Sequence, residues 1–207
     1  MPGLPLLTLF IPTFIAVSLT PGMCMTLALT LGMTVGLRRT FWMFWGELAG
    51  VMIVSVCSLA GAATVMLRYP EIFSLLKLTG GAWLIYLGLQ LCRQRGRMAL
   101  PEHLEGTQNI DRFTLASQGF ITAVSNPKGW AFFVSLLPPF IDSSRPVVPQ
   151  TASLVSIILF IEFCSLCLYA AGGRKLRTFL GKKGGGTLLN RISGILLALV
   201  GLWLVMS

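Results

Sequence analysis

The chain has 207 residues, of which 55% are hydrophobic and only 11% are charged, and its mean hydropathy is +0.80. Soluble domains carry about 25% charged residues, so this composition excludes an ordinary soluble protein and predicts a single integral membrane domain. We attribute the net charge of +9 to basic loops that face anionic lipid. Nucleic-acid binding is the rival explanation, but the basic residues lie in short loops and form no single stripe.

Hydropathy predicts six transmembrane helices, at residues 5–35, 40–67, 71–92, 113–141, 151–171 and 187–206. A helix needs about 20 apolar residues to cross a hydrocarbon core about 30 Å thick, and each run meets that length. The first run is expected to be a membrane span and no signal peptide, because no basic segment precedes it. The expected fold is therefore an all-α integral membrane protein.

The basic residues predict how the spans are oriented. Arg38 and Arg39 follow the first span, four arginines lie between the third and fourth, and six lysines and arginines lie between or beside the fifth and sixth. Because two spans separate each of these three loops from the next, the loops lie on the same side of the membrane. The positive-inside rule then places them in the cytoplasm and both termini in the periplasm. The predicted location is the bacterial inner membrane.

The spans form two groups of three within the single domain. Repeat one covers residues 1–92, a polar cytoplasmic linker covers 93–112, and repeat two covers 113–207. Because three is an odd number, the two groups would cross the membrane in opposite senses, as inverted repeats do. The first span of each group contains a turn sequence, SLTPGM in one and VSNPKG in the other. We therefore predict two inverted three-helix repeats whose first and fourth helices are broken in mid-membrane.

The two interruptions predict a transport site. Pro21 and Gly22 interrupt the first span, and Asn126, Pro127 and Lys128 interrupt the fourth. Proline removes a backbone donor, and the backbone groups that it frees cannot face lipid. They are expected to line a cavity, in which the start of each second half-helix attracts a carboxylate. For either proline taken alone, a structural kink remains the alternative.

Three ionisable residues lie inside predicted spans. Lys128 and Glu162 fall near the middle of theirs, whereas Glu47 lies nearer the cytoplasmic face. A charge at the membrane centre costs at least about 2.5–3.5 kcal/mol on insertion scales. Lys128 and Glu162 could form a structural salt bridge or a pair that couples substrate or proton movement. Glu47 could snorkel or pair with Arg39, or it could join the site.

Glycines at helical spacing predict close contacts between helices. Gly46 and Gly50 form a GxxxG motif in the second span, and Gly81 and Gly88 lie two turns apart in the stretch LTGGAWLIYLGLQL, where Gly80 precedes them. Helix packing within the chain is the simpler interpretation of these glycines. The GxxxG motif would also allow a homodimer.

Two other functional classes are alternatives to the transport function that the two interruptions predict. Cys164-x-x-Cys167 could belong to a thiol–disulfide carrier, which needs two accessible cysteines. A metal-ion exporter would want more His, Asp or Glu within the spans than this chain has. The sequence contains no nucleotide-binding loop and no GxSxG or HExxH motif. We therefore expect neither an enzyme nor a cofactor.

Several stretches, in this order and spacing, resemble one family: SLTPGMCMTLALTLGMTVGLRR, WGELAG, LLKLTGGAWLIYLGLQLCR, SNPKGWAFFVSLLPPFI, IEFCSLCLYA and LNRISGILLALVGLWL. The chain resembles the LysE/RhtB family of bacterial amino-acid exporters over nearly its whole length. The resemblance implies a six-helix inner-membrane protein that exports amino acids, driven by the proton-motive force. It also implies that the residues at both interruptions lie at a central site.

The resemblance has consequences for the acidic residues. Glu162 stands where the family commonly carries an acid in its fifth helix. Many relatives have an aspartate in the second helix at the place of Val51, and here the nearest acid is Glu47, four residues earlier. Either Glu47 replaces that group or this chain lacks it.

These expectations combine into a mechanism of alternating access. The carboxylate of an amino acid would meet the amides beyond Pro21 or Pro127, near Lys128, and its ammonium would meet Glu162. Protonation of Glu162 from outside would then release the substrate. The expected partners are thus an amino acid, protons and the lipid bilayer.

Overall fold

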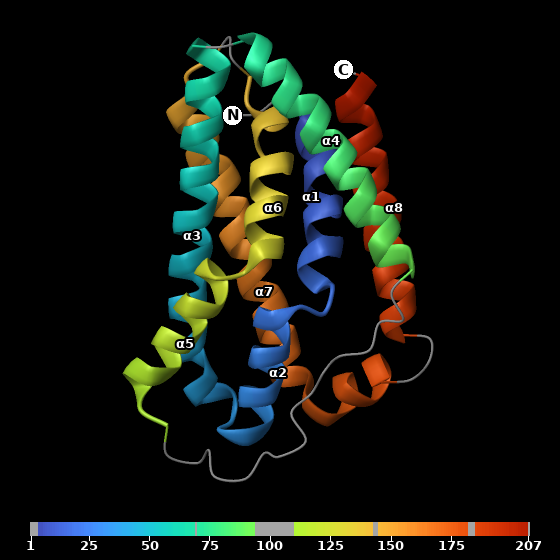
Figure 1. Cartoon of the computed structure of the whole chain (residues 1–207). Helices are drawn as coiled ribbons and strands as arrows, with labels where there is room; N and C mark the ends of the chain where they lie inside the picture. The colour runs from blue at the N-terminus through green and yellow to red at the C-terminus, as the bar shows by residue number, and fades with distance from the viewer. Residues whose placement is uncertain (1–3, 69, 94–109, 143–144, 182–184, 207) are drawn as a thin grey trace.

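The computed structural model describes residues 4–68, 70–93, 110–142, 145–181 and 185–206 (Figure 1). Within these ranges it contains eight α-helices, one short 3₁₀-helix and no strand, which confirms the all-α prediction. The elements in chain order are α1 (Leu4–Leu19), α2 (Met23–Thr34), α3 (Leu37–Arg68), α4 (Pro70–Arg93), α5 (Arg112–Val124), α6 (Pro127–Leu136), η1 (Pro138–Phe140), α7 (Val147–Gly181) and α8 (Gly185–Met206).

The predicted linker at 93–112 falls mostly outside the described residues. The helices on either side of it, α4 and α5, end and begin at its two edges. The fifth predicted span also ends where the structure changes direction. Gly173 in α7 has φ 45° and ψ −132°, which is not helical, and glycine is the residue that adopts positive φ without strain.

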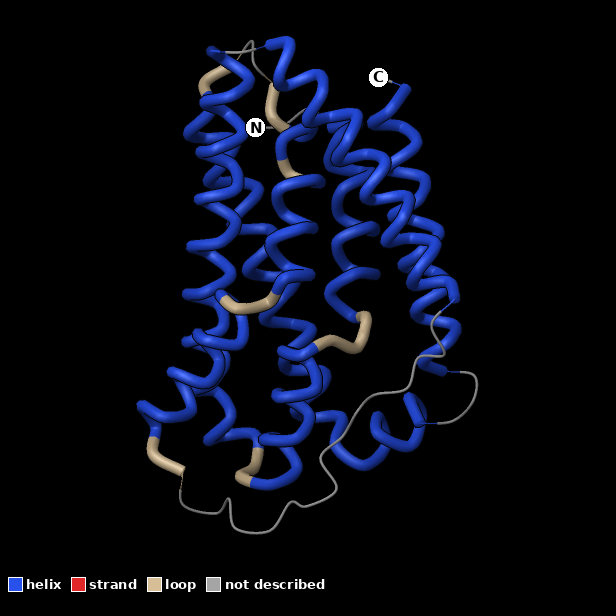
Figure 2. The backbone as a smooth tube through the Cα atoms, in the orientation of Figure 1, coloured by secondary structure: helices blue, strands red, loops and turns tan. Residues whose placement is uncertain are grey.

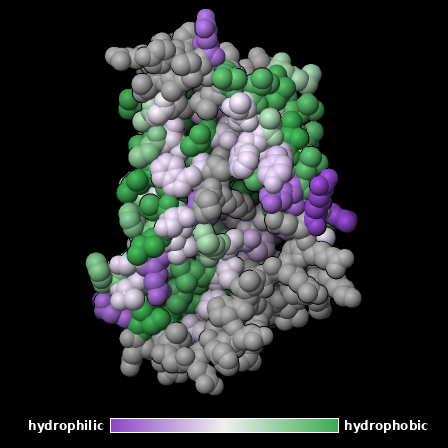
Figure 3. Space-filling model, viewed as in Figure 1, coloured by the Kyte–Doolittle hydropathy of each residue, from purple (hydrophilic) through white to green (hydrophobic). Residues whose placement is uncertain are grey.

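The described helices have the length and surface of a membrane protein. Leu37–Gly61 and Val147–Gly173 can each cross a bilayer, and α1 with α2 makes a third span if the pair is counted as one across its 54° bend. Large apolar side chains lie exposed on the flanks, among them Trp45 (61%), Phe160 (69%) and Leu199 (54%). Figure 3 shows apolar flanks, with hydrophilic residues gathered near the end of α4 and the start of α5. Such a surface suits lipid better than water.

The elements are arranged as one helical bundle (Figure 1). α1 and α6 occupy its upper half, α2 and α5 its lower half, and α3 and α7 run through both. α4 packs along α8, and the two termini lie at the same end. The chain turns from α2 into α3 at Gly36, whose φ of 82° lies in the left-handed region.

The two predicted interruptions coincide with breaks in the structure. α1 ends at Leu19 and α2 begins at Met23, while α5 ends at Val124 and α6 begins at Pro127. Proline suits the first position of a helix, because its missing N–H would have had no helical partner there. Figure 2 shows both short loops near the middle of the bundle's height. The local chemistry of the turn residues is therefore sufficient to explain where the two helices stop.

The buried core consists of two hydrophobic clusters. In the upper half, Phe10 and Phe14 of α1 pack on the rings of Phe132, Phe133 and Phe140. The second cluster joins α2, α3, α5 and α7, and its largest buried members are Leu29, Met43, Phe44, Leu115 and Tyr169. The broken helices cross the region between these clusters.

Glycines allow α3 and α5 to touch through their backbones. A Cβ added to Gly46 would overlap the carbonyl oxygen of Ala116, and one added to Gly50 would lie 2.7 Å from the Cβ of Ala123. The GxxxG motif therefore faces α5 of the same chain. Because α5 covers these glycines, the motif gives no free face for the homodimer that the sequence allowed.

A second glycine contact joins α4 to α8. Gly88 and Gly194 each approach the other's carbonyl oxygen so closely that a Cβ on either would overlap it, and a Cβ on Gly201 would lie 2.6 Å from the carbonyl oxygen of Gly81. The two contacts are seven residues apart on both helices and run in opposite directions, so the helices are antiparallel. Gly80, next to Gly81, faces the backbone of Ser135 in α6.

Candidate functional site

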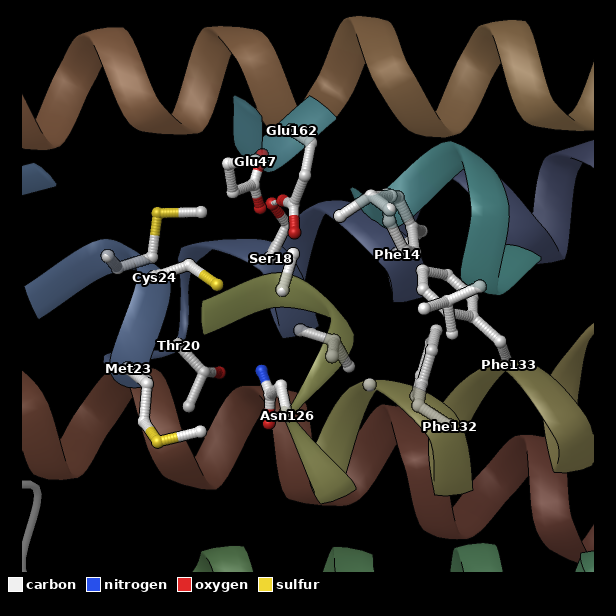
Figure 4. A pocket seen from close by; sticks show the side chains of 17 residues that line it. Phe14, Ser18, Thr20, Met23, Cys24, Glu47, Asn126, Phe132, Phe133 and Glu162 are labelled. Carbon is white, nitrogen blue, oxygen red and sulfur yellow. Dashed lines mark hydrogen bonds between the residues drawn. The ribbon is translucent and has the colours of Figure 1, made fainter. Parts of the chain in front are cut away.

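A cavity lies where the two helix breaks meet the long helices α3 and α7 (Figure 4). The space open to the centres of water molecules is about 70 Å³, which is enough room for several waters. Residues of both hydrophobic clusters line it, including Phe14 and Met25. Its polar side chains come from segments far apart in the sequence and are Ser18, Thr20, Cys24, Glu47, Asn126 and Glu162.

Glu162 of α7 is held by α1. The hydroxyl of Ser18 donates a hydrogen bond to its carboxylate, and Ser18 Oγ lies 2.9 Å from Ser165 Oγ, one turn further along α7. Ser18 and Ser165 are both buried. This arrangement fixes the direction of the Glu162 side chain and leaves it on the wall of the cavity.

Glu47 of α3 lies beside Glu162 on the wall of the cavity. Its side chain is fully buried, and neither carboxylate oxygen has a hydrogen-bond partner among the described residues. Figure 4 shows the Glu47 and Glu162 carboxyl groups pointing toward each other. Val51, one turn further along α3, lines the same cavity. The suggestion that Glu47 snorkels to the surface is therefore wrong, because packing from neighbouring helices covers it completely.

The start of α2 opens onto the same space. Gly22 is the residue before its first turn, has extended φ and ψ of −135° and −172°, and offers no side chain to cap the helix. Gly22, Met23 and Cys24 line the cavity. The first N–H groups of a helix have no partner within it and carry its positive dipole end. An anionic group in the cavity would find these donors at its wall.

Aromatic side chains donate hydrogen bonds to backbone carbonyls at both breaks. The Tyr169 hydroxyl donates to the carbonyl oxygen of Leu19, the last residue of α1, at 2.6 Å. In the same way, Trp130 Nε1 donates to the carbonyl oxygen of Val124, the last residue of α5, at 2.8 Å. A broken helix leaves carbonyls without helical donors, and in an apolar interior each costs several kcal/mol if it stays unpaired. The same solution serves both breaks.

The first break is also tied to α8. Ser193 Oγ donates to the carbonyl oxygen of Ala16 at 2.6 Å, and Thr20 Oγ1 lies 2.7 Å from Ser193 Oγ. Ser193 and Thr20 are both buried. The end of α1 is thus held by one hydroxyl from α7 and another from α8.

The structure brings together four of the residues that the sequence proposed for the site, namely Gly22, Glu47, Asn126 and Glu162. Pro21 is half-buried and is not among the described lining residues. Pro127 and Lys128 begin α6 beside Asn126, but their side chains lie outside the described residues. The described partner of Glu162 is Ser18, and the pairing of Glu162 with Lys128 stays a prediction.

Sequence reasoning missed the neutral polar residues around the cavity. Ser18 and Thr20 stand in the same SLTPG stretch as Pro21, so their closeness to the break was a usable signal. Tyr169 and Ser193 had no such signal, because they are more than 140 residues from the carbonyls that they bind. Helix rotation alone decides that they face the break.

Among the described residues, the groups that a thiol–disulfide carrier or a metal-ion exporter would need do not line this cavity. Cys164 is exposed and Cys167 half-buried on α7, and neither is among the described lining residues. No group of three His, Cys, Asp or Glu that could hold a metal ion occurs among the described residues. The cavity instead combines carboxyl groups, hydroxyls, aromatic rings and an uncapped helix start.

Comparison with known proteins supplies the family. The sequence model of the LysE type translocator matches residues 15–207. The chain belongs to the LysE-type translocator family. This confirms the resemblance seen in the sequence, and it makes the protein a membrane transporter and no enzyme.

Several curated relatives of this translocator carry functional names. A homoserine/homoserine lactone efflux protein of Salmonella typhimurium is 28% identical over 93% of this chain and 92% of its own length. A leucine efflux protein of Salmonella choleraesuis is 25% identical over 72% of this chain and 69% of its own. An uncharacterized membrane protein of Vibrio cholerae is 24% identical over 89% of each chain. No solved structure matches the chain significantly.

Proposed function

We propose that the chain is a secondary transporter that exports amino acids across the bacterial inner membrane, by alternating access and in exchange for protons. The observation that carries this proposal is the cavity in which both helix breaks meet two carboxyl groups, Glu47 and Glu162. Relatives named for leucine efflux and for homoserine efflux support amino acids as the substrate class.

The cavity offers a complementary group for each part of an amino acid. The substrate carboxylate would accept hydrogen bonds from the N–H groups at the start of α2, beyond Gly22. Its ammonium would lie between Glu47 and Glu162. An apolar side chain would rest against Phe14 and Phe132, which line the same space.

The directions of the half-helices support alternating access as the mechanism. The pair α1 and α2 runs opposite to the pair α5 and α6 (Figure 1), as two inverted three-helix repeats would. In that arrangement, one repeat rocks against the other around a fixed central site. The half-helices on either side of each break can then open the cavity to one face of the membrane at a time, with both termini on the periplasmic side.

The membrane potential supplies the driving force. A proton that enters across the membrane releases about 2.3 kcal/mol per 100 mV, and tenfold accumulation of a neutral solute costs about 1.4 kcal/mol. One proton per amino acid is therefore enough for export against a concentration gradient.

Efflux assays test the proposal. Cells are loaded with radiolabelled leucine or homoserine to measure efflux, or everted vesicles are incubated with the label to measure uptake. Transport is compared for the wild type, Glu162→Gln, Lys128→Ala and the control Glu71→Gln. Glu71 is exposed in the first turn of α4, so its variant should transport like the wild type. We expect both site variants to insert normally and to lose export. Normal export by both would remove the proposed mechanism, and no transport of any amino acid by the wild type would remove the function.

A further inference from the structure

We propose that Glu47 and Glu162 together hold one proton while the cavity is empty, and that the ammonium of the substrate displaces this proton. This inference rests on the proposed function, because it assigns the exchange of proton and substrate to one pair of side chains. It also gives Glu47 a role distinct from that of Glu162.

The two carboxyl groups differ in their hydrogen bonding. Ser18 donates its hydroxyl to Glu162, so that carboxylate already has a donor. Glu47 faces it from α3 with full burial and with no hydrogen-bond partner for either oxygen among the described residues. The Cys24 thiol beside Glu47 is only a weak donor. A buried carboxylate without a strong donor is disfavoured, whereas a carboxylic acid can itself donate to a neighbouring carboxylate. The arrangement therefore favours a proton on Glu47 that points toward Glu162.

The charges around the cavity support a shared proton. Among the described lining residues, the titratable side chains are Glu47 and Glu162 and the Cys24 thiol of α2, and none is a lysine, arginine or histidine. Two ionised carboxylates in one water-poor site repel each other, and such pairs commonly share one proton. Lys128, at the start of α6, is the nearest cation in the sequence to this site, and its side chain lies outside the described residues.

The exchange balances in charge and atoms. In the empty state the pair is one carboxylic acid and one carboxylate, with a net charge of −1. An arriving ammonium, R–NH₃⁺, supplies the positive charge that lets both groups ionise, and the O–H bond of Glu47 breaks to release H⁺ to water. With the substrate's own carboxylate at the start of α2, the loaded cavity holds three carboxylates and one ammonium, a net charge of −2. The released H⁺ accounts for the difference of one charge from the empty state. One proton leaves for each amino acid that binds, and one returns when the substrate departs.

Removing the titratable group from Glu47 should separate binding from coupling. In Glu47→Gln the amide can donate to Glu162, much as the carboxylic acid does, and Glu162 still offers one carboxylate to the ammonium. The variant should bind leucine without releasing a proton. It should therefore equilibrate leucine across a membrane but fail to concentrate it.

The experiment uses the purified full-length chain in detergent and in proteoliposomes, with leucine and homoserine as probes. In weakly buffered solution, the wild type should release about one proton per amino acid bound, and its affinity should rise about tenfold per pH unit over the range in which the pair holds its proton. For Glu47→Gln, proton release should fall to near zero and the pH dependence should disappear, while exchange of labelled for unlabelled leucine continues. Glu71→Gln should match the wild type.

The outcomes are separable. Binding by the wild type without proton release overturns the inference and leaves amino-acid export standing, and this measurement needs no variant that could misfold. Unchanged proton release in Glu47→Gln together with its loss in Lys128→Ala also overturns it, because the coupling would then belong to Lys128. If Glu47→Gln does not fold, Glu47→Asp should retain proton release, and a loss of release in that folded variant counts against the pair. Failure of the wild type to bind or move any amino acid would instead refute the proposed function.

Discussion

The hydroxyl of Tyr169 on α7 donates a 2.6 Å hydrogen bond to the carbonyl oxygen of Leu19, where α1 ends. Tyr169 is only 1% exposed, and Leu19 is half-buried. One side chain of the second half of the chain thus makes it possible for a helix of the first half to stop inside an apolar environment.

Tyr169→Phe should lower the stability of the protein by about 1–3 kcal/mol, because the phenyl ring leaves the Leu19 carbonyl buried without this donor. Thermal unfolding in detergent micelles measures the change. Tyr86→Phe is the matched control, since Tyr86 is 53% exposed on α4. Equal melting temperatures for the two variants would show that water or another group can replace the Tyr169 hydroxyl.

Gly46→Ala should destabilise the contact between α3 and α5 by about 1–3 kcal/mol or force the two helices apart, because overpacking a tight contact has that cost. The added Cβ would overlap the carbonyl oxygen of Ala116. Gly61→Ala lies on the same helix and meets nothing within 4 Å, so it should be neutral or slightly stabilising. Melting temperatures and detergent-resistant folded yield compare the two. A Gly46→Ala protein as stable as Gly61→Ala would contradict this helix contact.

Gly88→Ala and Gly194→Ala should each weaken the packing of α4 on α8, but their effects should not add. Each glycine approaches the carbonyl oxygen of the other, so the first substitution already separates the helices at that point. Residues in direct contact show interaction energies of about 0.5–3 kcal/mol in double-mutant cycles. Melting temperatures of the two single variants and the double variant complete the cycle. Strict additivity would place the two glycines in separate environments.

Chemical modification of Cys24 should block transport, and a bound amino acid should protect it. Cys24 lines the cavity, whereas Cys57 and Cys164 are exposed on the outside of the bundle. The measurement uses a variant in which the other four cysteines are serine, treated with a small thiol reagent in the presence or absence of leucine. This variant should transport normally before treatment. Loss of transport from the Cys164→Ser and Cys167→Ser changes alone would instead favour a thiol–disulfide carrier.

The positions of the two helix breaks could be predicted from the residues next to them. Pro21, Gly22 and Pro127 indicated where α1 and α5 end, because proline and glycine act on the backbone within a turn of their own position. The same reasoning identified Gly22 and Asn126 as candidate site residues, whereas Glu162 was identified as an ionisable group inside a predicted span. It could not decide whether Glu47 reaches the surface or joins the site. The answer depends on how α3 is rotated about its axis, which the sequence does not specify.

The sequence by itself determined the class of protein, its family, its all-α character and the two points at which helices are broken. These follow from composition and from interactions within a few residues, which the order of amino acids specifies directly. Only the tertiary structure decided that Glu47 faces Glu162, that Ser18 and Tyr169 supply the missing donors, and that Gly46 is covered by α5. Those facts depend on the rotation and depth of each helix, which are set by close packing between side chains more than 60 residues apart in the chain.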